Sequence, residues 1–144
     1  MNPRLQYRDW PGEAEGRLEW LRADLSDDIQ LDFRDGTTLN ALEAEVLRRF
    51  GELAALDAPE VGPFVAGVAT YLGELLIRRT GARWSWPVQP AAGDPPTLML
   101  TADFDFEVVS PWDIIAAAVR DRTGTAFTAF VRRWDPVEQT SDPH

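Results

Sequence analysis

The sequence has no cysteine and no lysine, and its single histidine, His144, is the last residue. The absence of cysteine excludes disulfides, thiolate metal sites and cysteine nucleophiles. A Ser-His-Asp triad or a histidine-bound zinc would have to use that one terminal imidazole. We therefore expect no metal, no cofactor and no catalytic residue.

Long apolar runs are also missing, since no stretch approaches the roughly 20 residues of a membrane span. The first residues mix Arg, Asp and Glu and contain no apolar signal-peptide segment. Lys+Arg total 14 against Asp+Glu 24, which gives a formal charge of −10. Nucleic acids and anionic membranes need concentrated basic side chains for contact. We expect a cytoplasmic protein with no nucleic-acid or membrane partner.

The 144 residues with 44% hydrophobic content are typical of one globular domain. We expect a single domain over residues 1–144, with an ordered core over about 12–134. Residues 1–11 and 135–144 are expected to be irregular termini.

Apolar residues at helical spacing predict helices before and after a sheet. The first predicted helix covers about residues 12–25. The second is capped by Thr37 or Thr38 and has an apolar stripe reaching Leu53, and the third covers about 63–79. The fourth runs from the Ser110 cap to Gly124, and a last helix runs through Trp134. In the second of these, Glu43 falls outside the apolar stripe, on the face expected to meet water. An extended segment is expected at 29–33.

Alternating polar and apolar residues predict strands at 82–88 and from 97 to 108, joined by a proline-rich loop. Twelve residues exceed the usual strand, so the second segment is either one strand or two strands broken near Ala102-Asp103. The expected class is α+β, a small antiparallel sheet with amphipathic helices before and after it, packed on one face.

Glu74 is the first candidate functional residue, because it is the only charged residue between Val61 and Ile77. A carboxylate among apolar neighbours needs a partner, which could be Arg78, Arg83 or a tryptophan N–H. Glu74 is then a clamp between helix and strand, a ligand-binding or catalytic acid, or a contact for a partner. In the second case the pocket would be lined by aromatic side chains, namely Tyr71, Trp84 and Trp86.

A row of acids on the second strand segment is the second candidate. Alternate strand positions lie roughly 6.5–7 Å apart, so Asp103, Asp105 and Glu107 would line one edge. Such a row can be an ordinary solvated face, a docking surface for a basic partner, or part of a divalent-metal site.

Two short motifs, Tyr71-Leu72-Gly73-Glu74 and Gly81-Ala82-Arg83-Trp84, resemble a family of uncharacterised bacterial domains. In that family an apolar helix ends in Tyr-Leu-Gly-Glu and a Gly-x-x-Trp strand entry follows. Leu31-Asp32-Phe33 matches an upstream segment, and the likeness covers about residues 30–115.

The resemblance implies a structural signature without a known activity. Gly73 would let another element approach the helix closely, and Glu74 would tie the helix to the Trp84 strand. Tyr71 and Gly81 are the other implied key positions. Some members resemble proteins encoded beside bacterial toxins, which implies an immunity or regulatory binding role.

The leading hypothesis from the sequence is a non-catalytic protein-binding domain, of immunity or regulatory type, whose acidic surface meets a basic protein. One alternative is an enzyme or small-molecule-binding domain that uses Glu74. Another is a homodimeric structural protein, in which the partner is a second copy of the chain.

Overall fold

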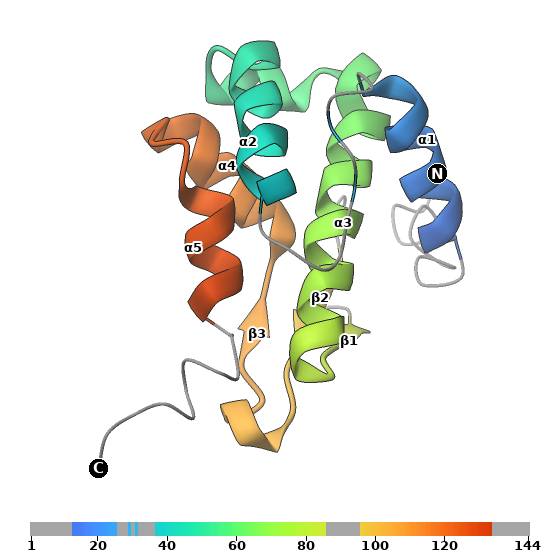
Figure 1. Ribbon diagram of the computed structural model, residues 1–144, viewed down its shortest axis with the longest axis vertical. Helices are drawn as coiled ribbons and strands as arrows, with labels where there is room; N and C mark the ends of the chain where they lie inside the picture. Colours follow the sequence, from blue (N-terminus) through green and yellow to red (C-terminus); the bar gives the residue numbers. More distant parts are fainter. Residues whose placement is uncertain (1–12, 26–28, 30, 32–36, 86–95, 134–144) are drawn as a thin grey trace.

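The computed structural model of the 144-residue chain describes residues 13–25, 29, 31, 37–85 and 96–133. These residues form an α+β fold, as the sequence predicts (Figure 1). Its α-helices are α1 (Ala14–Asp24), α2 (Thr37–Arg49), α3 (Gly62–Thr80), α4 (Pro111–Asp121) and α5 (Ala126–Arg133). Its strands are β1 (Arg83–Ser85), β2 (Thr97–Met99) and β3 (Val108–Val109), and the 3₁₀ helices are η2 (Leu53–Asp57), η3 (Pro59–Val61) and η4 (Ala102–Phe104).

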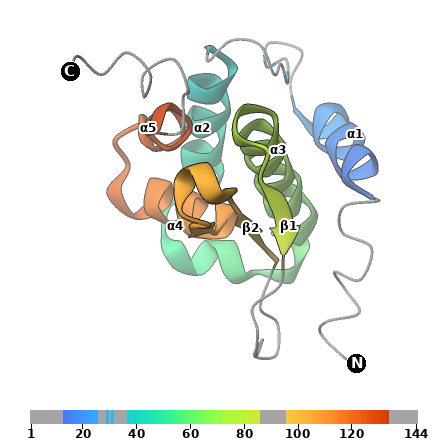
Figure 2. The same cartoon turned by 90° about the horizontal axis from the view of Figure 1, so that it is seen from below.

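Helix α3 is the central element and contacts α1, α4 and α5. It lies between α1 on one side and α2, α4 and α5 on the other (Figure 2). Its apolar sequence explains this position, because a helix that is hydrophobic around most of its circumference has to be covered by neighbours. Gly81 ends it with φ +78° and donates its N–H to the Ile77 carbonyl at 2.9 Å. That end is the one predicted from the sequence.

Helix α2 ends earlier than the sequence pattern predicts. Phe50 still donates its N–H to the Val46 carbonyl, but Glu52 has extended dihedral angles and breaks the helix. Leu53, predicted as the last residue of the apolar stripe, instead begins η2 and is 44% exposed. The stripe up to Phe50 is confirmed, and its extension to Leu53 is wrong.

The three strands form one antiparallel sheet in the order β1-β2-β3. Of the two alternatives for residues 97–108, the broken strand is right, because the chain turns through η4 between β2 and β3. One row across the sheet packs against the helical core: Trp84, Leu98 and Val109. The next row is exposed to solvent: Arg83, Met99 and Val108. The sheet therefore has one covered and one open face.

Helix α4 begins as its sequence predicts. Ser110 is the N-cap, its hydroxyl accepts the Asp113 N–H at 3.3 Å, and Pro111 follows at the first helical position. The helix ends at Asp121, ahead of the predicted Gly124, because Arg122 adopts the left-handed conformation with φ 52°.

Several expectations lie outside the described residues. These are the place of Trp86 in a pocket, the place of Trp134 in the last helix, most of the extended segment at 29–33, the loop between β1 and β2, and both termini. Within the described ranges, no helix is long and apolar enough to cross a membrane.

Candidate functional site

Glu74 joins helix α3 to strand β1. The Trp84 indole Nε1–H donates a hydrogen bond to Glu74 Oε2 at 3.2 Å, and both side chains are half-buried. Of the partners considered for this carboxylate, the structure shows the tryptophan. The geometry fits the clamp, because an acceptor on the last turns of the helix fixes the first strand after it.

Gly73 makes this clamp sterically feasible. The Trp84 ring lies directly over the Gly73 Cα, so that a Cβ at this position would overlap the indole. The same Cβ would come within 3.4 Å of Leu98 Cδ1 on β2. The close approach implied by the family resemblance is therefore present, and it is an approach of the sheet to α3.

Tyr71, the next predicted site residue, is fully buried among the core side chains. Its ring packs with the core and presents no surface to solvent. Trp86, the third aromatic residue predicted for a pocket, lies outside the described residues. Of the predicted aromatic set, Trp84 contacts Glu74.

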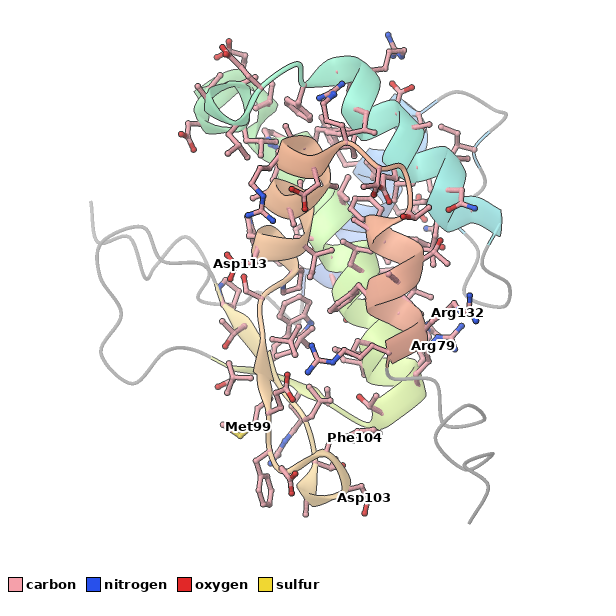
Figure 3. All side chains as sticks on the ribbon, turned by 90° about the vertical axis from the view of Figure 1, so that its left-hand side faces the viewer. Arg79, Met99, Asp103, Phe104, Asp113 and Arg132 are labelled. Atoms are coloured by element: carbon pink, nitrogen blue, oxygen red, sulfur yellow. The ribbon has the colours of Figure 1, made fainter. Side chains whose placement is uncertain are left out.

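The predicted row of acids on one strand is wrong. Asp103 lies in the 3₁₀ helix η4, and Asp105 follows it with φ 58°, so neither belongs to a strand. Both are exposed on the turn between β2 and β3, which extends beyond the helices at the lower end of the molecule (Figures 1 and 3). We call residues Thr97–Val109 the hairpin.

Glu107 is not aligned with the other two acids. It is half-buried, and its Oε2 accepts a hydrogen bond from Arg133 Nη2 of α5 at 2.9 Å. Its backbone carbonyl accepts the Leu100 N–H, which closes the hairpin turn. Glu107 thus anchors the hairpin to α5, while Asp103 and Asp105 remain at the tip.

The hairpin also carries exposed apolar side chains. Phe106 is 61% exposed and Val108 56%, and Met99, the register partner of Val108, is 41% exposed. By the alternation of apolar and polar residues alone, the sequence predicts Phe106 and Val108 on the packed face of the sheet. The turn through η4 reverses that assignment.

The tip holds two consecutive non-glycine residues, Asp105 and Phe106, in the left-handed region, with φ values of 58° and 54°. The Phe106 N–H bonds to the Thr101 carbonyl at 3.0 Å, and the Asp105 N–H to the Ala102 carbonyl. Left-handed backbone costs an ordinary L-residue roughly 1–2 kcal/mol. These hydrogen bonds hold the two residues in place against that cost.

Glu43 is the residue whose role the sequence reading missed. The sequence predicts it outside the apolar stripe of an amphipathic surface helix, yet it is completely buried. Its two carboxylate oxygens accept the backbone N–H groups of Ala126 at 3.1 Å and Phe127 at 2.8 Å. The carboxylate therefore caps the start of α5, where N–H groups lack partners within the helix.

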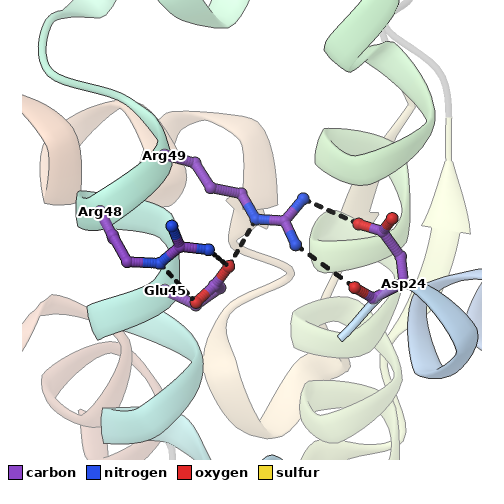
Figure 4. A network of polar contacts seen from close by, with 4 residues as sticks. All are labelled: Asp24, Glu45, Arg48 and Arg49. Atoms are coloured by element: carbon purple, nitrogen blue, oxygen red, sulfur yellow. Dashed lines mark hydrogen bonds and ion pairs between the residues drawn. The ribbon is translucent and has the colours of Figure 1, made fainter. Parts of the chain in front are cut away.

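A network of charged side chains connects α1 and α2 (Figure 4). The Arg49 guanidinium donates to Glu45 and Asp24, both at 2.7 Å, and lies 4.1 Å from the centre of the Phe64 ring. Arg48 contacts the same Glu45 carboxylate. The hydrogen bond from Arg48, with Arg49 adding to it, lowers the pKa of the Glu45 carboxyl below its ordinary value.

Chemistry that requires clustered ligands finds no support in the described ranges. Among residues 13–25, 29, 31, 37–85 and 96–133, no group of three or more His, Cys, Asp or Glu side chains could hold a metal ion. No family model, curated protein or solved structure matches the chain significantly.

Proposed function

We propose that the protein is a cytoplasmic, non-catalytic protein-binding domain, of the immunity or regulatory type, that contacts a basic protein through acidic surface. The observation that carries the proposal is the pair of exposed carboxylates, Asp103 and Asp105, on the projecting tip of the hairpin. The formal charge of −10 favours a partner of opposite sign, because long-range attraction accelerates association.

The positions of the other candidate residues, Glu74 and Tyr71, support the same proposal. Glu74 contacts the Trp84 indole in a helix-to-strand clamp, and Tyr71 is buried. The family resemblance adds the immunity-type role, since some of its members resemble proteins encoded beside toxins.

The rival hypothesis is that Glu74 is a working acid, and Glu74→Gln separates the two. A clamp loses stability, whereas a working acid keeps the fold and loses activity or ligand binding.

The experiment is capture of host-cell proteins on the immobilised full chain at low and at high salt. We expect basic proteins to be retained at low salt and released at high salt, because ions screen exposed charge pairs. The variant Asp103→Asn/Asp105→Asn should reduce the retained amount several-fold. Asparagine tolerates the left-handed backbone at position 105, so this variant should fold normally.

A matched control removes the same charge elsewhere. Asp57→Asn/Glu60→Gln neutralises two exposed carboxylates on η2 and η3, at the opposite end of the molecule (Figure 1). It should retain the basic proteins as the unmodified chain does. Salt-insensitive retention, or equal loss in both double variants, contradicts a tip-directed acidic contact.

A further inference from the structure

The exposed large apolar side chains of the described residues are unevenly distributed. Three of them, Met99, Phe106 and Val108, lie on the hairpin. The other two are single, Trp20 on α1 and Leu53 on η2. Scattered apolar residues are normal on a protein surface, whereas a group on one element marks a contact surface.

Two of the three hairpin residues lie side by side on the open face of the sheet, and the third precedes them on the turn. Met99 and Val108 are direct partners in the antiparallel register, and such pairs have Cβ atoms about 4.5–5.5 Å apart. Phe106 is two residues before Val108, at the tip. We call Met99, Phe106 and Val108 the hairpin face.

Phe106 has a costly position for a residue that contributes little to the core. Its ring is 61% exposed although its backbone is left-handed, a conformation suited to glycine or asparagine. Either of those residues would make the same turn with less strain. Strain of this kind is concentrated at functional sites, where it holds a side chain ready for binding.

The charges around the face determine which occupant fits. Asp103 and Asp105 are exposed at its tip end, and Arg83 is exposed at its other end, as the register partner of Met99. A second copy would bring another formal charge of −10 against the first, which disfavours the chain as its own partner. A segment whose cations lie over the tip can pair with the two carboxylates. The negative net charge of the chain also attracts such a segment.

We propose that the hairpin face docks a basic segment of another protein, with Phe106 as the anchor. The segment presents an apolar side chain to Met99, Phe106 and Val108, and arginine or lysine to Asp103 and Asp105. Arg83 fixes the orientation, because it keeps the segment's cations at the tip end. This proposal rests on the proposed function and adds to it the contact residues and the chemistry of the partner.

The test uses a displayed library of random peptides as the probe and the immobilised full chain as the target. We expect the selected peptides to carry an aliphatic or aromatic residue beside arginine or lysine. They should bind the variant Phe106→Asn at least about tenfold more weakly, as expected for loss of an anchor residue. Asparagine fits the left-handed backbone, so thermal unfolding should show an intact fold.

Leu53→Asn is the matched control, since it removes an exposed apolar side chain on η2, a segment at the opposite end of the molecule from the hairpin (Figure 1), and should leave peptide binding unchanged. Equal binding to Phe106→Asn, selected peptides without basic residues, or no enrichment would overturn the docking face. If binding is lost in Asp103→Asn/Asp105→Asn but not in Phe106→Asn, the hairpin face fails while the proposed function stands. Insensitivity to both variants contradicts both proposals.

Light scattering completes the test. We expect the mass of one chain for the unmodified protein and for Phe106→Asn alike. A mass of two chains that falls to one in Phe106→Asn would show that the occupant is a second copy, and this would overturn the basic partner.

Discussion

Carboxylates have opposite surroundings in two regions of the molecule. These regions are the junction between α2 and α5 and the tip of the hairpin. At the junction, Glu43 is fully buried and accepts two backbone N–H groups of α5. In return, Arg122 from the segment after α4 donates to the carbonyls of Leu47 and Phe50 at the end of α2, both at 2.8 Å. At the tip, Asp103 and Asp105 face solvent.

The same contrast holds for apolar groups and backbone. At the junction, side chains of this chain form hydrogen bonds with the backbone groups at the helix ends. The large apolar side chains there are buried. The tip exposes Phe106 and holds two residues in a strained conformation. We therefore expect substitutions at the tip to leave the fold intact. Substitutions at the junction should lower the free energy of unfolding.

The largest effect is expected from Glu43→Ala at the junction. It leaves the half-buried N–H of Ala126 and the buried N–H of Phe127 without their acceptor, and a buried group of this kind costs about 1–3 kcal/mol. We expect the free energy of unfolding to fall by about 3 kcal/mol. Urea denaturation measures it, with Glu60→Ala as an exposed control that should change stability by less than about 0.5 kcal/mol. Equal effects in the two variants would show that the cap is dispensable.

The next effect is expected from Gly73→Ala beneath the Trp84 ring. The new Cβ overlaps the indole, so the ring has to move and strain the clamp with Glu74. We expect a loss of about 2 kcal/mol, as for overpacked sites. Gly16→Ala in α1 is the control, because its Cβ would meet nothing within 4 Å and alanine favours the helix by roughly 0.5–1 kcal/mol. If both substitutions stabilise the protein, the clamp is not rigid.

A smaller and pH-dependent effect is expected from Glu45→Gln in the network of Figure 4. Arg48 and Arg49 lower the pKa of Glu45 in the folded state, so its stabilisation is present above the ordinary value of 4.5 and is lost as pH falls through the folded pKa. We expect a loss of about 1 kcal/mol at neutral pH. The difference from the unmodified chain should shrink in acid, as followed by thermal unfolding across pH. A constant difference, or a similar one in Glu52→Gln, would contradict this cause.

The smallest effect is expected at the tip, and it has the opposite sign. Phe106→Gly removes an exposed ring and relaxes the left-handed backbone, so we expect stability to rise by about 0.5 kcal/mol. Differential scanning calorimetry would detect the higher unfolding temperature. A clear loss of stability would mean that Phe106 serves the fold, and the contrast between tip and junction would disappear.

The sequence predicts the elements whose signals are local. The apolar run of α3, its end at Gly81 and the Ser110 cap of α4 depend on neighbouring residues, and each is where the pattern puts it. The antiparallel pairing of β1 and β2 also follows from local alternation.

Features that depend on distant contacts escape the sequence. Glu43 looks like an ordinary polar position, because its partners, Ala126 and Phe127, are more than 80 residues away. The alternation after Met99 records residue types but not the sign of φ, so it could not show that Asp105 and Phe106 turn the chain. Of the candidate site, the acids at the tip could be named from the sequence, while their apolar neighbours could not.

The cap on α5 constrains the order in which the protein can be completed on the ribosome. Synthesis runs from the N-terminus, so α2 emerges long before Ala126 and Phe127 exist. Until they arrive, the Glu43 carboxylate lacks the two N–H groups that it accepts in the folded protein. The nascent chain can complete this cap only when the start of α5 has been made.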